Sequence, residues 1–347
     1  MKALARAGML GVLVALAPPL DLSGQPATGC DRAGDVEFVC GQQAPEDLVV
    51  VPGSAWVLAS AYSGTGGIYL TSVRNRTSTV AYPTPASRDR LDAATYDSCP
   101  GPLDAGGRAT FTTHGLYLET GGDSVHTLYA VHHGSRESVE VFEVDARGSR
   151  PELTWIGCAV APEPIGLNSV RALPGGGFVA TNFLSRGGNG GGRGRLMAGQ
   201  NNGELWEWHT GTGWSIVPGS EASGANGLEI SDDGRWFYVA AWGSQSFFRL
   251  SRGATPPTRE EVPLGFRVDN VRWASDGALL AAGQGGAPPM QASIVVKIDP
   301  DTLAVREILR RPNTDTFSAG TVAVEIEGNL WVGSFRGDRI AIFPAAP

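Results

Sequence analysis

Residues 227–240 read Gly-Leu-Glu-Ile-Ser-Asp-Asp-Gly-Arg-Trp-Phe-Tyr-Val-Ala: an apolar run, a turn containing Asp233-Gly234, and a second apolar run. This pattern is typical of two antiparallel strands joined by a tight turn, because Gly tolerates the backbone conformation that such a turn needs. Four other parts of the chain repeat it, with turns at Pro52-Gly53, Pro174–Gly177, Ser275–Gly277 and Glu327-Gly328. The sequence therefore predicts a series of similar strand–turn–strand units.

The spacing of these units predicts how they assemble. Their first strands begin near residues 47, 115, 168, 226, 269 and 321, roughly forty to seventy residues apart, which leaves room for about four strands per unit. The chain has 48 Gly, 23 Pro and only 18% charged residues, a composition that suits short strands and tight turns. We therefore predict an all-β fold, a six-bladed β-propeller with a central channel.

Two segments depart from the repeating pattern. Lys2 and Arg6 precede the apolar run Met9–Ala17, which is typical of a secretory signal and too short to cross a bilayer. We expect residues 1–29 to be a signal-peptide-like segment and residues 30–347 to be one propeller domain of a secreted or periplasmic protein, with a lipid anchor on Cys30 as an alternative. Residues 186–203 are too Gly-rich to be expected to pack, and we interpret them as a disordered loop or a mobile lid over the channel mouth.

Charge and cysteine content narrow the partners and the compartment. The formal net charge is −8 and no run of Lys or Arg is present, which disfavours nucleic acid and anionic membranes as partners. The charge does not indicate which small molecule binds. Cys30, Cys40, Cys99 and Cys158 lack the spacing of a zinc or redox site. They fit one or two disulfides in an exported protein, and three pairings remain open.

Side chains bearing oxygen recur at the start of the predicted inner strands. In a propeller these strand ends converge on one end of the channel, so their side chains should meet there. Asn and Asp are also common turn formers, but recurrence at the same place in four units favours a shared site. Hard oxygen donors without Cys or His suit calcium. The predicted ligands of a calcium ion in the channel are Glu46, Asn168, Asn226, Asp269 and Asn270.

Two histidines lie near the same end of the predicted channel. His114 opens the inner strand of the second unit, and His133 ends the strand that follows. A His at the channel mouth could act as a general base on a water beside the ion, although a lone His is often structural. Aromatic residues near strand ends could line an apolar pocket there: Tyr117, Phe183, Trp242 and Phe335.

With these segments the chain resembles the paraoxonase/arylesterase family, within the wider SMP-30/gluconolactonase-like propellers. The matching segments include Pro45–Leu48, His114-Gly115, Leu128–His133, Gly166–Asn168, Ala225–Gly227 and Val268–Asn270. The resemblance implies that the five oxygen-bearing residues hold a catalytic calcium and that His114 and His133 correspond to the family's proposed catalytic pair. It also implies a calcium-dependent hydrolase of lactones or aryl esters.

The chain departs from the family pattern at two points. The family's second, structural calcium would use Asp47, but Ser169 stands where a further acid is needed, so this ion is in doubt. The family's disulfide to the last strand cannot form, because no Cys follows Cys158. Two alternatives stay open: a sugar lactonase of the gluconolactonase branch, and a non-catalytic binding propeller that calcium only stabilises.

Overall fold

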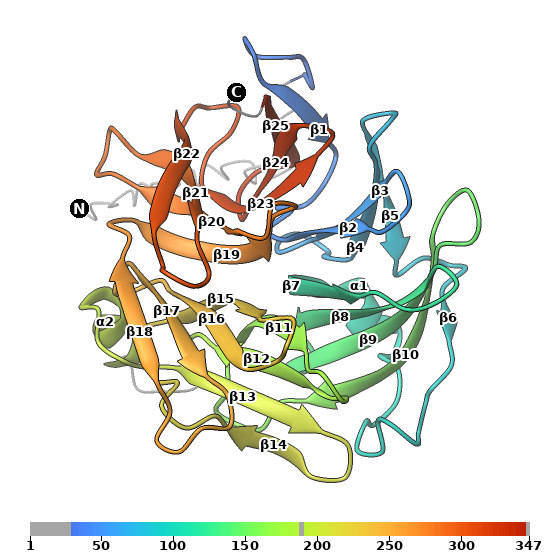
Figure 1. The fold of residues 1–347 in the computed structure, drawn as a ribbon. Helices are drawn as coiled ribbons and strands as arrows, with labels where there is room; N and C mark the ends of the chain where they lie inside the picture. The colour runs from blue at the N-terminus through green and yellow to red at the C-terminus, as the bar shows by residue number, and fades with distance from the viewer. Residues whose placement is uncertain (1–28, 187–190, 345–347) are drawn as a thin grey trace, which may run out of the picture.

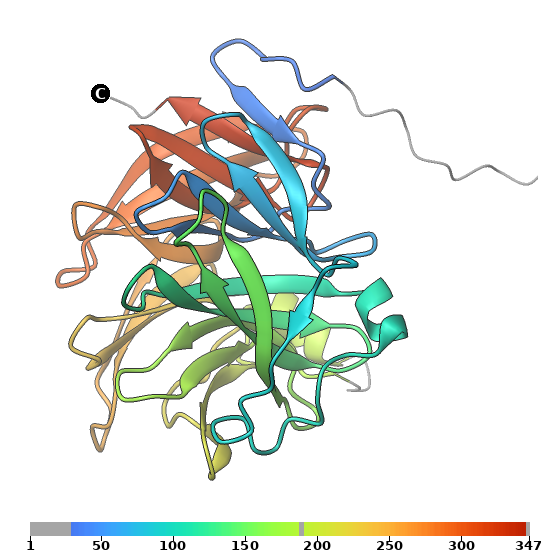
Figure 2. The same ribbon diagram turned by 90° about the vertical axis from the view of Figure 1, so that its right-hand side faces the viewer.

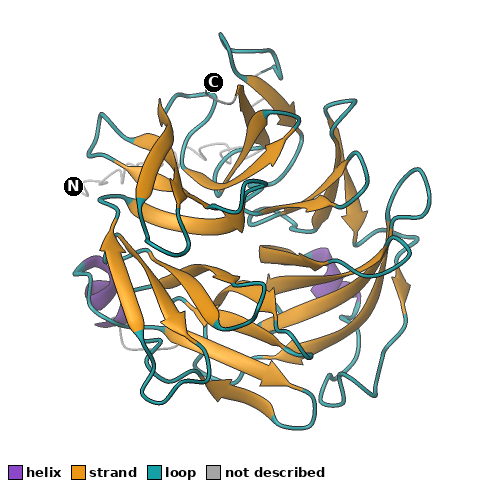
Figure 3. Cartoon of the chain, viewed as in Figure 1, coloured by secondary structure: helices purple, strands orange, loops and turns teal. Residues whose placement is uncertain are grey.

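The computed structural model describes residues 29–186 and 191–344, which form six β-sheets arranged around a common axis (Figure 1). Two short helices are present among these residues, α1 (Ala105–Ala109) and α2 (Gly191–Met197) (Figure 3). The prediction of an all-β, six-bladed propeller is confirmed. The expected signal segment, residues 1–29, lies outside the described residues except for its last position.

Five of the sheets are built from strands that follow one another along the chain, with the first strand nearest the axis. The first sheet contains β2 (Leu48–Val51), β3 (Trp56–Ser60), β4 (Ile68–Ser72) and β5 (Thr77–Tyr82). The second contains β7 (Thr112–Glu119), β8 (Val125–His133), β9 (Ser138–Asp145) and β10 (Glu152–Val160), with β6 (Arg88–Asp89) parallel to β10 at its edge. The third contains β11 (Leu167–Ala172), β12 (Phe178–Asn182), β13 (Glu204–His209) and β14 (Gly213–Ile216). The fourth contains β15 (Ala225–Ile230), β16 (Trp236–Ala241), β17 (Ser246–Ser251) and β18 (Arg259–Pro263), and the fifth contains β19 (Arg267–Trp273), β20 (Leu279–Gly285), β21 (Ala292–Ile298) and β22 (Val305–Pro312).

The sixth sheet joins the two ends of the described chain. Its three inner strands are β23 (Gly320–Ile326), β24 (Asn329–Ser334) and β25 (Arg339–Pro344). Its outer strand is β1 (Glu37–Cys40), which pairs antiparallel with β25 and lies beside it in Figures 1 and 2. The N-terminal strand therefore closes the ring of sheets.

The buried fraction of the strand residues decreases from the inner strands to the outer edge, and this explains why the inner strands are more apolar. In the third sheet every residue of β12 is buried, whereas β14, at the outer edge, is half-buried or exposed. Strands covered on both faces tolerate continuous apolar runs, while an edge strand with one face in water does not require them. The apolar core accordingly lies between neighbouring sheets; one cluster joins Val179 and Leu205 of the third sheet to Leu228 and Phe237 of the fourth.

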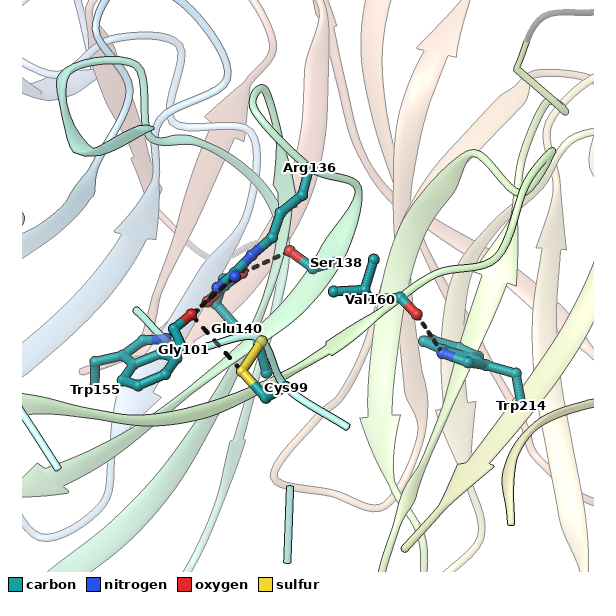
Figure 4. Close-up of a disulfide and its surroundings, with 9 residues drawn as sticks. Cys99, Gly101, Arg136, Ser138, Glu140, Trp155, Val160 and Trp214 are labelled. Carbon is teal, nitrogen blue, oxygen red and sulfur yellow. Dashed lines mark hydrogen bonds and ion pairs between the residues drawn. A yellow bond between two sulfur atoms is a disulfide. The ribbon is translucent and has the colours of Figure 1, made fainter. Parts of the chain in front are cut away.

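Two disulfides settle the pairing that the sequence left open. Cys30 is bonded to Cys40, and Cys99 is bonded to Cys158 on β10 (Figure 4). Both are typical of a protein that matures in an oxidising compartment, in agreement with export. Because the sulfur of Cys30 is committed to this bond, a lipid anchor at that position is not supported. No helix among the described residues is long and apolar enough to span a membrane.

The expectation for residues 186–203 was wrong in part. Residues 187–190 lie outside the described residues, but residues 191–197 form helix α2. The helix packs through Leu196, which is 4% exposed and fits against Gly224 and Gly243. This contact, with a hydrogen bond from Ser223 Oγ to the backbone oxygen of Leu196, holds a Gly-rich segment that composition alone marks as unable to pack.

Candidate functional site

The predicted ligands lie where the inner strands are interrupted. β11, β15 and β19 each pair with the next strand of their sheet, and the register of each pairing shifts after the first one or two residues. At the shift, two consecutive residues of the inner strand have no paired partner on the neighbouring strand. The unpaired residues are Asn168-Ser169, Asn226-Gly227 and Asp269-Asn270, and β7 has the same irregularity at His114-Gly115. A β-bulge frees a strand locally from the ladder and re-aims its side chains. The repeated bulge therefore explains why these side chains converge at one end of the channel.

Two glycines allow neighbouring bulges to come this close. A Cβ added at Gly115 would lie 2.3 Å from the backbone oxygen of Asn168, and one at Gly227 would lie 2.4 Å from the backbone oxygen of Asp269. Neither contact is compatible with a side chain, so Gly is needed here for close approach of one inner strand to the next. In His114-Gly115 and Asn226-Gly227, a side chain of the site is thus followed by the Gly that lets the next inner strand come close.

The bulges open into a cavity of about 300 Å³ at one end of the channel. Its polar lining includes Glu46, His114, Asn168, Asn226 and Asp269, which are among the residues singled out from the sequence. Asn270 does not line the cavity directly; its amide Nδ2 donates a hydrogen bond of 2.6 Å to Glu46 Oε1. The structure therefore brings all five predicted ligands to one place.

Four oxygen atoms at this place are buried without a hydrogen-bond partner among the described residues. They are Glu46 Oε2, Asn168 Oδ1, Asn226 Oδ1 and Asn270 Oδ1. A buried acceptor that finds no donor is costly, and four such oxygens close together fit the ligand set of a hard cation. No group of three or more His, Cys, Asp or Glu in the described part of the chain is arranged to hold a metal. An ion here would therefore depend on the Asn oxygens as well as on the two carboxylates.

Burial without a countercharge perturbs both carboxyl groups. The pKa of Asp269 is raised from its ordinary 3.8 to about 7 by burial, against hydrogen bonds from Gln284 and Asn226 that lower it. Burial, with the nearby charges of Asp269 and Asp47, also raises the pKa of Glu46 well above its usual range. A divalent cation would favour the ionised form of both groups and remove this penalty.

The two histidines form a hydrogen-bonded pair beside these carboxyl groups. His114 Nδ1 lies 2.9 Å from His133 Nε2, and His114 Nε2 lies 3.7 Å from Glu46 Oε2 and 3.4 Å from Asn168 Nδ2. Burial, with the charge of His133, holds the pKa of His114 well below its usual range, so His114 is neutral. Tyr62 packs on the His114 ring at a centroid distance of 4.3 Å, which fixes the ring in place.

Asp47, the doubtful ligand of a second calcium, has a cationic partner within the protein. Its carboxylate accepts hydrogen bonds from the backbone N–H of Leu48 at 2.8 Å and of Leu116 at 2.7 Å, and pairs with the guanidinium of Arg272. Arg272 is itself buried and donates to the backbone oxygens of Leu48, Leu116 and Val271. Arg272 therefore supplies the positive charge that balances the buried carboxylate of Asp47.

The aromatic lining agrees with the sequence interpretation except at one position. Phe183, Trp242 and Phe335 line the cavity, but Tyr117 does not. Tyr117 lies three residues beyond His114 on β7 and lines a different cavity, where Arg171 lies over its ring at 4.0 Å. Sequence reasoning missed Tyr62 and residues Arg193, Leu196 and Met197 of α2, which also line the site, because they come from loops and a helix outside the repeating units.

Comparison with known proteins supports the fold. The chain matches no protein-family model, and no curated protein sequence is significantly similar to it. Its structure is similar to a luciferin-regenerating enzyme, with 15% identity, coverage of 89% of this chain and 94% of that one, and a TM-score of 0.56. It is also similar to the PQQ-bound form of an aldose sugar dehydrogenase from Streptomyces coelicolor, with 14% identity, coverage of 92% and 99%, and a TM-score of 0.55.

A third similar structure is that of a candidate gluconolactonase, with 16% identity, coverage of 89% of this chain and 91% of that one, and a TM-score of 0.50. This likeness supports the six-bladed propeller fold expected from the sequence. The three proteins differ in their named activities, so the shared fold does not identify the reaction. The chemistry has to be argued from the side chains of the site.

Proposed function

We propose that this protein is a calcium-dependent hydrolase of lactones or aryl esters. The observation that carries the proposal is the set of four buried, unpartnered oxygens beside the neutral side chain of His114. Oxygen donors, two of them carboxylates, suit Ca²⁺ better than a softer metal. Glu46, Asn168, Asn226, Asp269 and Asn270 would hold the ion, and its charge would match that of Glu46 and Asp269.

His114 is the general base of the proposed reaction. When bound, calcium would polarise the substrate carbonyl group. His114 Nε2 removes a proton from water while the water oxygen attacks the carbonyl carbon, and the same proton is later passed to the leaving oxygen as the C–O bond breaks. The hydrogen bond between His114 Nδ1 and His133 Nε2 keeps the imidazole ring oriented during both transfers.

The lining of the cavity favours an apolar substrate. Phe183, Leu184, Leu196, Trp242 and Phe335 surround the polar site. A sugar lactone has several hydroxyl groups, each of which would lose hydrogen bonds to water on entering such surroundings. A lactone with an alkyl chain or an aryl ester would instead bury apolar surface favourably. The lining therefore favours the arylesterase and lactonase reading over the sugar lactonase alternative.

Hydrolysis of phenyl acetate, a medium-chain δ-lactone and an aldonolactone by the purified protein tests the proposal. We expect turnover of the first two that is lost in EGTA and restored by calcium, with little turnover of the aldonolactone. Asp269→Asn should abolish the calcium-dependent activity, whereas Asp232→Asn, the same change in an exposed turn on β15–β16, should not. Preferred turnover of the aldonolactone would support the sugar lactonase instead. Calcium-dependent thermal stabilisation without any turnover would support the non-catalytic binding propeller.

A further inference from the structure

We propose that Glu137 is a positioning residue that determines which nitrogen of His114 carries the proton. The inference deepens the proposed function and rests on His114 acting as the base. Glu137 lies in the turn between β8 and β9, is 6% exposed, and was not singled out from the sequence. It belongs to a chain of hydrogen bonds that runs from the cavity away from the channel.

The chain of hydrogen bonds contains four side chains. Asn168 Nδ2 lies 3.4 Å from His114 Nε2, and His114 Nδ1 lies 2.9 Å from His133 Nε2. His133 Nδ1 lies 3.1 Å from Glu137 Oε1 and 3.0 Å from Oε2. Glu137 Oε1 also accepts a 2.7 Å hydrogen bond from the backbone N–H of Leu167, the residue before Asn168.

Only one direction of donation satisfies every member of this chain. A carboxylate has no proton to give, so His133 Nδ1 must donate to Glu137. Asn168 Nδ2 can only donate, so His114 Nε2 accepts and the ring proton of His114 lies on Nδ1, which donates to a lone pair at His133 Nε2. His114 consequently carries its lone pair on Nε2, the nitrogen that faces Asn168 Nδ2 and the cavity. Glu137 thereby holds the base in the tautomer that can accept a proton from water.

The turn that carries Glu137 is fixed on both sides. Arg136 donates to Glu140 at 2.7 and 2.8 Å, and Ser138 Oγ donates to Glu140 at 2.6 Å. Arg136 also donates to the backbone oxygen of Gly101 at 2.9 Å, close to the Cys99–Cys158 disulfide, as Figure 4 shows. Neighbours with locked side chains hold a functional group to the tolerance that catalysis needs. The position of Glu137 is therefore set by the second sheet and its disulfide.

Glu137 also stabilises the charge that forms during the reaction. When His114 Nε2 takes a proton, the imidazole becomes positive and its Nδ1–H bond to His133 strengthens. Because His133 donates in turn to a carboxylate, the positive charge is opposed by Glu137 through two hydrogen bonds. The proton count is unchanged along the chain, since no proton needs to leave His133 or Glu137.

Glu137→Gln reverses the direction of donation with little change of shape. The amide oxygen of Gln can keep the hydrogen bond from Leu167 N–H, which places its NH₂ group against His133 Nδ1. That nitrogen must then accept, so the proton of His133 moves to Nε2 and that of His114 moves to Nε2 as well. The base would present N–H to the cavity in place of a lone pair. Glu119→Gln is the matched control, because it makes the same change at the last residue of β7, at the other end of that strand from His114.

The test combines kinetics with ¹⁵N NMR of the ring nitrogens in calcium-loaded protein. The chain has only five His, and a His114→Gln sample assigns the signals of that ring. We expect Glu137→Gln to lower kcat at least about tenfold, part of the 10²–10⁴-fold that a positioned base contributes, with KM within about twofold. The proton of His114 should move from Nδ1 to Nε2, while the unfolding temperature and the calcium affinity stay close to those of Glu119→Gln.

An unchanged kcat together with a proton that stays on His114 Nδ1 would overturn the inference. A fall in kcat with no change at His114 would also overturn it, because the loss would then have another cause. If the wild-type protein hydrolyses none of the esters, the proposed function fails. The NMR comparison still decides whether Glu137 sets the tautomer, so the two failures can be told apart.

Discussion

Asp269→Asn should make the calcium-free protein more stable at high pH while it removes the response to calcium. The pKa of Asp269 is raised by burial from 3.8 to about 7. A carboxyl group with a raised pKa in the folded state contributes stability that is complete below 3.8 and is lost as the pH rises towards 7. The full loss corresponds to about 4 kcal/mol, at about 1.4 kcal/mol per pH unit. Asn cannot ionise and suffers no such loss.

The measurement is urea unfolding followed by Trp fluorescence, in EGTA, at pH 5 and pH 9. The free energy of unfolding of Asp269→Asn, relative to that of the wild type, should increase by about 3 kcal/mol when the pH is raised from 5 to 9. In calcium at pH 9 the wild type should recover about 2.7 kcal/mol at an ion concentration one hundred times Kd, and the variant almost nothing. Parallel pH profiles in EGTA, or equal stabilisation of both proteins by calcium, would refute the reasoning. Asp232→Asn should behave as wild type throughout.

Three further changes test the scaffold around the site. Arg272→Met leaves Asp47 buried without its cationic partner and should lower the free energy of unfolding by about 3–5 kcal/mol in urea; a loss below about 1 kcal/mol would show that the pair is unimportant. Gly227→Ala places a Cβ against the backbone oxygen of Asp269 and should cost about 1–3 kcal/mol of stability and weaken calcium binding measured by calorimetry. Replacing both cysteines of Cys99–Cys158 by Ser opens a loop of 59 residues and should lower stability by about 4 kcal/mol, and an unchanged urea midpoint would contradict this expectation.

Much of the fold could be predicted because each blade is local in sequence. All six inner strands begin within a few residues of their expected positions, since apolar runs and Gly-containing turns specify hairpins on their own. The role of β1 could not be predicted in this way. Glu37–Cys40 is short, and its partner β25 lies about three hundred residues later in the chain. Nothing in the local pattern indicates a pairing at that separation.

The residues of the candidate site also differ in how far the local sequence could predict them. The oxygen-bearing side chains were recognisable because bulges repeat them at one place in successive strands. Tyr62 was not, because it lies between strands and reaches His114 only through the tertiary fold. Glu137 was not either, because a Glu four residues after His133 in a turn carries no pattern that distinguishes it from an exposed turn residue. Arg272 was hidden for another reason: three residues after Asp269 on a regular strand, it would face away from the channel, and the bulge turns it back towards Asp47.

The closure of the ring by β1 governs when the protein can finish folding. β1 is made early, and its backbone groups stay without their strand partner until β25, near the other end of the described chain, is available. The first five blades can form hairpins as they appear, but the last one joins only when both chain ends are free to meet. The Cys30–Cys40 bond closes a short loop around this strand and limits the conformations it samples while it waits. The β1–β25 pairing therefore joins two segments about three hundred residues apart, and a circular permutant opened in an exposed outer loop would turn this long-range pairing into a local one.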